Sequence, residues 1–340
     1  MKRELRMAVW EITDACNLDC KHCYKRMISS SNEEYIDEVD IEYLLNEMKS
    51  LGLKTLVISG GEPILKLRTV THLINICNEL GIETILTSNG TLLNEKYVDA
   101  LKNKGLSSIQ ISLDGVDGPA HDCIRGDGTF KKTIEAIELC VKKGLSVTIM
   151  TVPTIYSMDD LDELYSLACY LHVNCLGIER PIASTFKSEY YFDSDNLKRL
   201  HEKIENLEKR GHVKIHCNDP IYQIRKLSNT ISNISLIKEV GDMLHCGCSS
   251  CTSSCVISSN GVVRACTFVD YRIGDLRRDS FTNIWNSKEK AAVCDRTSKF
   301  GKCSGCTYFN ICKGCFAQRI ALGYSLEGSD ESCYLRSISF

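Results

Sequence analysis

The fold of this 340-residue chain depends on the run Trp10-Glu-Ile-Thr-Asp-Ala-Cys16-Asn-Leu-Asp-Cys20-Lys-His-Cys23-Tyr24. Its three cysteines stand in the spacing C-x3-C-x2-C, directly after an apolar run that is typical of a β-strand. Three thiolates are one fewer than the four that normally hold an iron–sulfur cluster, so one iron would stay open to a small molecule. A structural zinc knuckle is the alternative, because His22 could serve as a fourth ligand.

The composition favours bound metal over disulfides. The chain has 20 cysteines, and its first residues, Met1-Lys-Arg-Glu-Leu-Arg6, are not followed by the apolar segment of a signal peptide. No stretch approaches the ~18 uncharged apolar residues that a membrane-spanning helix needs. We therefore expect a cytoplasmic protein, in which disulfides are rare and clustered cysteines bind metal. The formal net charge of −3 gives no reason to expect nucleic acid or a membrane as a partner.

Strand-like and helix-like segments alternate from residue 6 to about residue 180. Six apolar, β-rich runs are expected as strands: Met7–Ile12, Thr55–Ser59, Glu83–Thr87, Ser108–Leu113, Val147–Val152 and Asn174–Ile178. The stretches between them have the helical period: Ile41–Leu51, Val70–Leu80, Glu95–Lys102, Phe130–Lys143 and Leu161–Leu171. This alternation predicts an α/β fold whose parallel strands form a wound or barrel sheet. In both arrangements the functional residues collect at the C-terminal ends of the strands.

The rest of the chain differs in pattern. Residues 191–245 contain a long polar helix, Ser194–Arg210, and a short strand-like run, Val213–His216, and we interpret them as a helical bridge. In residues 246–340 regular periodicity fades, cysteines become dense and aliphatic residues are few, so bound metal would supply much of the folding energy. The predicted domains are therefore 1–190, 191–245 and 246–340.

The N-terminal cysteine run, with the aromatic Tyr24 directly after it, resembles the radical S-adenosylmethionine (SAM) superfamily. The resemblance implies that Cys16, Cys20 and Cys23 hold a [4Fe–4S] cluster whose open iron binds the amino and carboxylate groups of SAM. One electron from the cluster would then cleave SAM and release a 5′-deoxyadenosyl radical. The resemblance also implies that residues 1–190 form a partial (β/α)6 barrel of the TIM type.

Companion motifs follow the next three expected strands. Ser59-Gly60-Gly61-Glu62-Pro63 resembles the family's GGEP motif, which receives the methionine ammonium. Glycines let backbone carbonyls approach a ligand closely, and the acidic side chain would lie beside a cation. Thr87-Ser88-Asn89-Gly90 and Ser112-Leu-Asp114-Gly115 resemble the family's contacts to the ribose and the carboxylate. The cofactor contacts that the resemblance implies are Tyr24, Gly60, Gly61, Glu62, Pro63, Ser88, Asn89, Ser112, Asp114 and Arg125.

Arg125 belongs to a longer motif. The run His121-Asp122-x2-Arg125-Gly126-x-Gly128-x-Phe130 resembles the H-D-x-x-R-G-x-G-x-F signature of the peptide-modifying branch. Because a guanidinium fork is well shaped for a carboxylate, Arg125 is expected to pair with the carboxylate of the cofactor. An ordinary surface arginine is the alternative.

The cysteine-rich tail resembles the SPASM extension of the same superfamily, and the resemblance implies two auxiliary [4Fe–4S] clusters. The first would use Cys266, Cys315 and two of Cys246, Cys248, Cys251 and Cys255, with Cys248 and Cys251 favoured by their spacing from Gly261. The second would use Cys303, Cys306, Cys312 and Cys333. The tail departs from the family pattern in that two residues, rather than three, separate Cys312 from Cys315. A pair of zinc sites is the alternative.

Enzymes with a SPASM extension mostly modify ribosomally made peptides, and others mature sulfatases or build haem. Sulfatase-maturing members carry an aspartate directly after the cysteine of a G-x4-C motif, where this chain has Thr267. We therefore expect a radical SAM oxidoreductase that abstracts hydrogen from a ribosomal peptide and crosslinks or epimerises it. Sulfatase maturation, tetrapyrrole decarboxylation in haem synthesis and a zinc-stabilised scaffold without chemistry are the alternatives.

Two further expectations concern partners and hydrogen donors. The expected barrel begins within the first ten residues, which leaves no room for an N-terminal leader-binding module. A separate recognition protein would then deliver the peptide, or the barrel itself would hold it, and a flavodoxin or ferredoxin would donate electrons. An epimerase returns a hydrogen atom from a thiol, for which Cys217 and Cys255 are the candidates.

Overall fold

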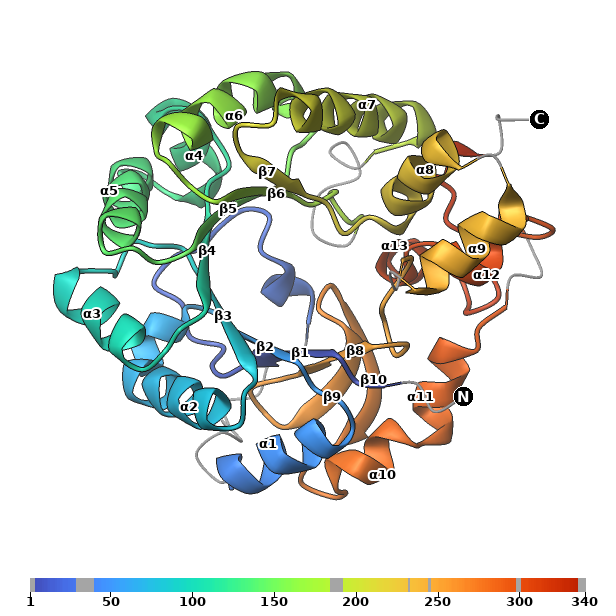
Figure 1. Cartoon of the computed structure of the whole chain (residues 1–340), viewed down its shortest axis with the longest axis horizontal. Coiled ribbons are helices and arrows are strands. Elements are labelled where there is room, and N and C mark those ends of the chain that lie inside the picture. Colours follow the sequence, from blue (N-terminus) through green and yellow to red (C-terminus); the bar gives the residue numbers. More distant parts are fainter. Residues whose placement is uncertain are drawn as a thin grey trace.

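The computed structural model describes residues 4–28, 40–183, 192–231, 233–243, 246–297 and 301–335. In this part of the chain ten strands form one sheet in the order β10-β9-β8-β1-β2-β3-β4-β5-β6-β7 (Figure 1). The strands are β1 (Met7–Glu11), β2 (Thr55–Ser59), β3 (Glu83–Ser88), β4 (Ser108–Ser112), β5 (Val147–Thr151), β6 (Cys175–Ile178), β7 (Lys214–His216), β8 (Ser254–Ile257), β9 (Val262–Cys266) and β10 (Val269–Asp275). Strands β1 to β7 are all parallel to their neighbours.

The sheet curves into an open barrel with helices on its outside (Figure 1). The helices of the barrel are α1 (Ile41–Ser50), α2 (Leu67–Glu79), α3 (Glu95–Asn103), α4 (Gly118–Arg125), α5 (Thr129–Lys142), α6 (Leu161–Tyr170) and α7 (Ser194–Arg210). The predicted α/β fold of the partial TIM type is confirmed, and the ends of the six predicted strands differ by at most one residue. The segment interpreted as a bridge adds β7 to the sheet as a further parallel strand.

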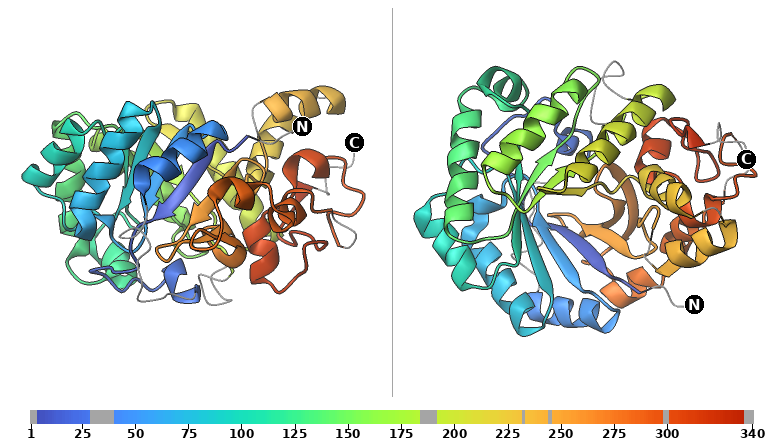
Figure 2. Two further views of the ribbon diagram at one scale, coloured as in Figure 1. Left: turned by 90° about the horizontal axis from the view of Figure 1, so that it is seen from below. Right: turned by 45° about the horizontal axis from the view of Figure 1, so that its top comes forward.

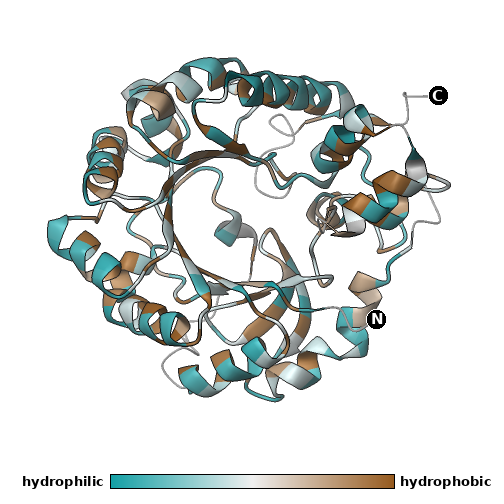
Figure 3. Ribbon diagram, viewed as in Figure 1, coloured by the Kyte–Doolittle hydropathy of each residue, from teal (hydrophilic) through white to brown (hydrophobic). Residues whose placement is uncertain are grey.

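Alternation along the strands separates a helix-facing row of side chains from a row that faces the lumen of the barrel. Ala8 and Leu56, which are in register on β1 and β2, are fully buried. Val9 and Val57, one residue further along, are only half-buried because they line the lumen. Figure 3 shows the same division, with hydrophobic colour along the strands and hydrophilic colour on the outer sides of the helices.

Short polar side chains start the helices. Asp40, Asn94 and Asp193 accept hydrogen bonds from backbone N–H groups in the first turns of α1, α3 and α7. Asp117 caps α4 in the same way, with Pro119 in the first turn. α4 was not among the helices expected from the sequence, although this aspartate and proline are the signals that indicate a helix start.

The region after residue 246 is joined to the barrel. β8 pairs in parallel with β1, and β9 and β10 continue the sheet as antiparallel strands. The weak periodicity predicts little regular structure here, whereas the structure contains three strands and short helices. Outside the barrel wall lie α8 (Pro220–Thr230), α9 (Ile234–Met243), α10 (Phe281–Trp285), α11 (Lys288–Cys294), α12 (Phe309–Cys312) and α13 (Phe316–Ala321), gathered on one flank in Figure 2. Within the described ranges no helix has the length and apolar character needed to cross a membrane.

Candidate active site

The three cysteines of the N-terminal motif lie together in the loop between β1 and the 3-10 helix η1 (Tyr24–Met27). Burial raises the pKa of the Cys16 and Cys20 thiols, and the negative charge of the neighbouring thiols raises it further. The positive charge of Arg125 opposes this shift at Cys20. Three thiolates this close repel one another unless they share a cation, so the loop fits the three-thiolate cluster that the sequence implies.

The glycines of the GGEP run lie against the backbone of the cysteine loop. The backbone N–H groups of Gly61 and Glu62 donate hydrogen bonds to the carbonyl oxygens of Thr13 (2.7 Å) and Ala15 (2.8 Å). A Cβ atom on Gly60 would lie 2.4 Å from the Thr13 oxygen, and one on Gly61 would lie 2.1 Å from the Ala15 oxygen. In the structure these glycines permit a close approach of the cluster loop, and their expected contact with the cofactor stays a prediction.

Glu62 ties the ends of β2 and β3 together. Its buried carboxylate accepts hydrogen bonds from the Ser88 hydroxyl (2.9 Å) and the Asn89 backbone N–H (2.8 Å), while Pro63 starts the 3-10 helix that follows. Burial raises the pKa of Glu62, and these hydrogen bonds oppose the rise. The Asn89 side-chain amide donates to Asn17 Oδ1 (3.0 Å), inside the cysteine loop. The structure therefore brings the second and third motifs onto the first.

Asp114 is the centre of a buried charge cluster beside the cysteines. Its Oδ2 atom lies 2.6 Å from Arg125 Nε and 3.1 Å from His22 Nε2, and its Oδ1 atom accepts from the Val152 backbone N–H (3.0 Å). Although burial favours the neutral acid, Arg125 and His22 hold the pKa of Asp114 well below its usual range. Arg125 thus has a protein carboxylate as its partner, and His22 faces Asp114 in the same way. Ser112, at the end of β4, is half-buried.

The remaining residues of the His121 signature shape the turn that carries this cluster. Asp122 accepts hydrogen bonds from the backbone N–H groups of Gly128 and Phe130, both at 2.7 Å, and so fixes the start of α5. His121 Nδ1 accepts from the Asp114 backbone N–H (3.2 Å), and its ring packs edge-on against Phe130. Burial and the nearby Arg125 lower the pKa of His121 to about 4, which keeps the ring neutral at pH 7.

Four cysteines of the tail line one small cavity together with apolar side chains such as Ile221 and Phe309. The cysteines are Cys303, Cys306, Cys312 and Cys333. Burial raises the pKa of Cys312 and Cys333, in the second case to about 12, and the charge of neighbouring thiols raises both further. The four residues proposed for the second auxiliary cluster therefore line one cavity, and four cysteines are the number that holds a [4Fe–4S] cluster.

Three of the cysteines proposed for the first auxiliary cluster also gather. The Ser250 hydroxyl lies within hydrogen-bonding reach of the thiols of both Cys248 and Cys266. Burial raises the pKa of Cys266 to about 11 and raises that of Cys315, and the charge of Cys248 adds to both shifts. The structure thus places the end of β9, the start of α13 and the segment before β8 around a common point.

A buried arginine supports an anionic group at this point. Arg296 is only 3 % exposed, and its Nη1 atom donates to the Val293 carbonyl oxygen (2.8 Å). Its Nε and Nη2 atoms have no hydrogen-bond partner within the described residues. Although burial opposes ionisation of Cys248, the charge of Arg296 helps to lower the pKa of that thiol. Unpaired buried donors of a cation are costly, and a cluster held by thiolates would supply the missing negative charge.

The other cysteines near this site are arranged differently. Cys251 is fully buried, and burial, followed by the charge of Cys294, raises its pKa to about 12; Cys248 contributes less. Cys294, in α11, was not singled out by the sequence analysis, because it matches no motif spacing. Cys255 neighbours Cys251, and Cys246 is half-buried. Cys248, Cys251, Cys266 and Cys315 therefore remain the proposed ligands, with Cys294 as an additional neighbour.

Of the two thiols proposed as hydrogen donors, only Cys255 belongs to a strand. Cys255 is in register with Ala8, in the buried row that faces away from the lumen. Cys217 directly follows β7, and its thiol lies near the charges of Asp219 and Glu179. Cys175 of β6, which the sequence analysis did not select, is on the lumen row.

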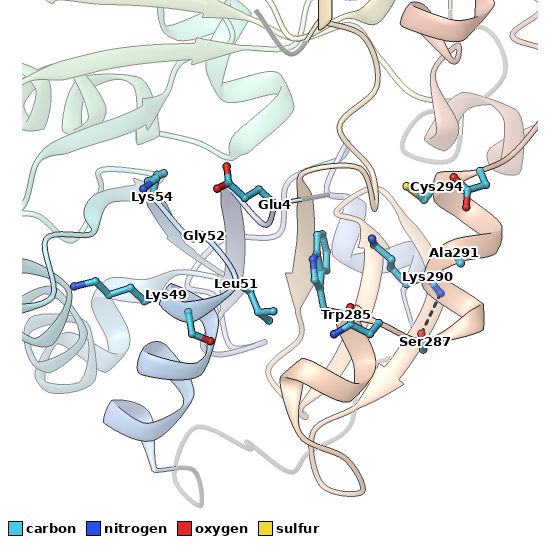
Figure 4. Close-up of a pocket in the computed structure, with 13 residues that line it drawn as sticks. Glu4, Lys49, Leu51, Gly52, Lys54, Trp285, Ser287, Lys290, Ala291 and Cys294 are labelled. Carbon is cyan, nitrogen blue, oxygen red and sulfur yellow. Dashed lines mark hydrogen bonds between the residues drawn. The ribbon is translucent and has the colours of Figure 1, made fainter. Parts of the chain in front are cut away.

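A separate pocket lies at the seam between the α1–β2 connection and the helices α10 and α11 (Figure 4). It is lined by Glu4, Lys54, Trp285, Lys290 and Cys294 among others, and the Lys290 ammonium lies 4.4 Å from the centroid of the Trp285 ring. Because Lys54 precedes β2, this pocket is at the N-terminal end of the strands, opposite the cysteine loop.

Two known families match the segments that contain the cysteine loop and most of the tail cysteines. Residues 10–168 match the model of the Radical SAM superfamily, and residues 246–316 match SPASM, an iron–sulfur cluster-binding domain. The chain belongs to the radical SAM superfamily. It is a radical SAM enzyme of the SPASM group, whose cofactors are [4Fe–4S] clusters and SAM.

Relatives of this radical SAM enzyme differ in their substrates. It is 28% identical to the AdoMet-dependent heme synthase of Methanosarcina barkeri, over 93% of this chain and 92% of that one. It is 25% identical to the mycofactocin maturase MftC of Mycolicibacterium smegmatis, over 95% and 81% of the two chains. The structure of Streptococcus suis SuiB bound to its precursor peptide SuiA superposes with a TM-score of 0.78, at 20% identity, over 97% of this chain and 76% of that one. This last likeness shows the shared fold.

Proposed function

We propose that this enzyme abstracts a hydrogen atom from a peptide held in the lumen of the barrel, and so crosslinks or epimerises it. When bound, SAM and the N-terminal cluster supply a 5′-deoxyadenosyl radical. In a thioether crosslink the substrate carbon, having lost its hydrogen atom, would bond to a thiol sulfur, and the thiol proton would leave to a base. The one electron left over would need an acceptor, a role that an auxiliary cluster would supply. Cys16, Cys20 and Cys23 would hold the first cluster, and the tail cysteines the two others.

The polar side chains on the wall of the lumen support this proposal. Side chains in register across four strands form a polar, uncharged row: Thr87, Gln110, Thr148 and Cys175. Thr87 Oγ1 and Gln110 Oε1 lie 3.3 Å apart, which shows that both side chains turn toward each other along this row. Hydroxyl and amide groups both donate and accept hydrogen bonds, so the row can pair with the amides of a peptide segment.

A tetrapyrrole with several carboxylates would need a matching set of cations. On the lumen row of the described strands β1 to β7, the basic side chains are Lys214 and His216, and the acidic ones are Glu11 and Glu83. Glu179, one residue beyond β6, adds an acid nearby, where Asn218 Nδ2 donates to its Oε1 atom (3.0 Å). This balance favours a largely neutral substrate segment over a polyanion.

Tetrapyrrole decarboxylation is the second candidate, because the haem synthase relative aligns over nearly its full length. The peptide proposal has parallel support from the mycofactocin maturase relative and from SuiB, which binds a precursor peptide. The fold is common to all of these proteins, so the substrate has to be decided by experiment.

The test gives one enzyme preparation both substrates. Anaerobically reconstituted protein, SAM and a reductant are incubated either with candidate short peptides encoded near the gene or with iron coproporphyrin III. The proposal predicts a peptide that loses a pair of hydrogens, or exchanges an α-hydrogen in deuterated water, and an unchanged porphyrin. Carbon dioxide release from the porphyrin with an unchanged peptide would establish the second candidate instead.

The position of Cys175 separates the two peptide reactions. An epimerisation needs a thiol that can reach the substrate radical, and Cys175, the first residue of β6, is on the lumen row while Cys255 is not. We expect Cys175→Ala to abolish inversion but not hydrogen abstraction if the product is an epimer. A crosslinking reaction would retain its product in this variant.

A further inference from the structure

Glu11 and Arg264 form a buried ion pair between the two cofactor-binding regions. Glu11 ends β1, and Arg264 lies in β9, next to the end of that strand at Cys266. Glu11 Oε2 is 2.7 Å from Arg264 Nη2, and the two side chains are 0% and 1% exposed. Glu11 precedes the three cysteines of the N-terminal run and Arg264 lies between Gly261 and Cys266, but neither was expected to have a role of its own.

The carboxylate of Glu11 holds the residues that follow the last cysteine of the N-terminal motif. The Tyr24 hydroxyl donates to Glu11 Oε1 (3.0 Å), and Lys25 Nζ donates to Glu11 Oε2 (2.9 Å). The Tyr24 ring packs edge-on against Phe268, with 5.8 Å between the ring centroids. The loop of the first cluster is therefore anchored to Glu11 on one side and to the SPASM region on the other.

The guanidinium of Arg264 holds the turn after Cys266 in the same way. Its Nη1 atom donates to the carbonyl oxygens of Thr267 (3.1 Å), Val269 (3.3 Å) and Cys266 (3.4 Å). Its Nε atom donates to the Ser258 hydroxyl (2.8 Å). All three guanidinium nitrogens thus have partners, and the charge of Arg264 lies close to the backbone of a proposed cluster ligand.

Charge is balanced in this group. Arg264 and Lys25 are the cations, and Glu11 and Asp14, which also pairs with Lys25, are the anions. An unbalanced charge in a buried site acts strongly on its neighbours because the local dielectric constant is low. Reduction adds a negative charge to a cluster, so an uncompensated cation beside it would stabilise the reduced form and raise the potential.

We propose that Glu11 is a positioning residue that joins the two cluster loops, neutralises Arg264, and thereby sets the reduction potential of the auxiliary cluster ligated through Cys266. Glu11 does so from the wall of the barrel, where its side chain is fully buried. The inference depends on the family's cofactors and on this ion pair, and is independent of whether the substrate is a peptide or a tetrapyrrole.

The test is a redox titration followed by EPR of the full chain, in a Cys16→Ala/Cys20→Ala/Cys23→Ala background that retains only the auxiliary clusters. Glu11→Gln leaves Arg264 uncompensated, and the potential of one auxiliary cluster should shift to a more positive value. Glu11→Gln/Arg264→Met restores the balance of charge, and the potential should return toward that of the parent protein. An unchanged potential in Glu11→Gln with full iron content would overturn the proposal.

The neighbouring strand offers a matched control. Arg272 lies opposite Arg264 on β10 and pairs with Asp270 (3.2 Å), but its side chain is 55% exposed. Asp270→Asn should leave both auxiliary potentials unchanged, because water compensates the freed arginine. If Glu11→Gln loses iron, the iron content of Glu11→Gln/Arg264→Met decides. Recovered iron content supports the proposal, because it traces the loss to the uncompensated charge of Arg264. Iron content that stays low overturns the proposal.

Discussion

A Cβ atom on Gly61 would lie 2.1 Å from the carbonyl oxygen of Ala15, well inside any tolerated contact. Gly61 is the middle residue of the second motif, Ser59–Pro63, and Ala15 directly precedes the first cysteine of the cluster loop. The second motif therefore has glycine at this position because the cluster loop packs on it. A variant with one extra methyl group tests this arrangement.

Gly61→Ala should displace the cluster loop and prevent assembly of the N-terminal cluster. Iron content should fall from about 12 to about 8 per chain, since the auxiliary sites are not in contact with Gly61. SAM cleavage to 5′-deoxyadenosine should be lost. Gly81→Ala is the control, because Gly81 has a positive φ of 66° but no atom within 4 Å of an added Cβ. Full iron content and SAM cleavage in Gly61→Ala would show that the loop tolerates the methyl group.

Asp114→Asn should destabilise the protein strongly, because it leaves Arg125 buried without its charged partner. The free energy of unfolding at pH 7 should fall by about 3–5 kcal/mol. The pKa of Asp114 is lowered from its ordinary 3.8, so its stabilising effect is complete above that pH and declines only in stronger acid. Urea unfolding at pH 7 and below pH 4 should therefore give a difference from wild type that shrinks in acid.

Asp159→Asn is the matched control for that experiment. Asp159 is 70% exposed and lies 3.7 Å and 3.8 Å from the cationic groups of Arg199 and Lys203. An exposed pair contributes only about 0–1 kcal/mol. Equal losses in the two variants would mean that the Asp114 cluster is no more than another surface ion pair.

Glu179 should make the protein less stable as the pH rises from about 5 to 8. Burial raises the pKa of Glu179 from 4.5 to about 7, so in this window the folded state keeps a proton that the unfolded state has released. Stability falls with pH wherever the folded state binds more protons. Glu179→Gln, which can still accept from Asn218, should lose less stability over the same window. Parallel pH profiles of the two proteins would contradict a raised pKa; Glu135→Gln, in the exposed face of α5, controls for the loss of one charge.

Arg296→Met should separate the stability of the iron-free protein from its capacity for iron. The unpaired donors of Arg296 destabilise the iron-free state. The unfolding temperature of the iron-free variant should therefore be no lower than that of the iron-free wild type. After reconstitution it should bind about 4 fewer irons, because the counter-charge at Cys248 is gone. Arg278→Met, at an 85% exposed side chain, should change neither quantity. Full iron content in Arg296→Met would show that the first auxiliary cluster assembles without the charge of Arg296.

The strands and the cysteine loop were predictable because both are local patterns. Alternating burial along β2 and a capping aspartate before α1 are encoded within a few residues, and so is the spacing from Cys16 to Cys23. The set of four cysteines at the apolar cavity followed from the resemblance to a family, and the structure brings Cys303 and Cys333 together as that resemblance implies.

The relations that the sequence did not reveal are contacts between distant segments. Nothing near Cys255 indicates that β8 pairs with β1, and this pairing turns the Cys255 thiol away from the lumen. Cys294 matches no spacing, yet it lies beside Cys251. The Arg125 guanidinium has the right shape for a cofactor carboxylate, but the sequence could not show that it pairs with the carboxylate of Asp114.

The most direct test of the central claim follows deuterium from a perdeuterated peptide substrate into 5′-deoxyadenosine. The account predicts that the reconstituted enzyme releases 5′-deoxyadenosine carrying deuterium, because a radical formed at the Cys16–Cys23 loop attacks a peptide in the lumen. Stoichiometric zinc in place of iron with no 5′-deoxyadenosine, or 5′-deoxyadenosine without deuterium while iron coproporphyrin III is decarboxylated, would contradict it.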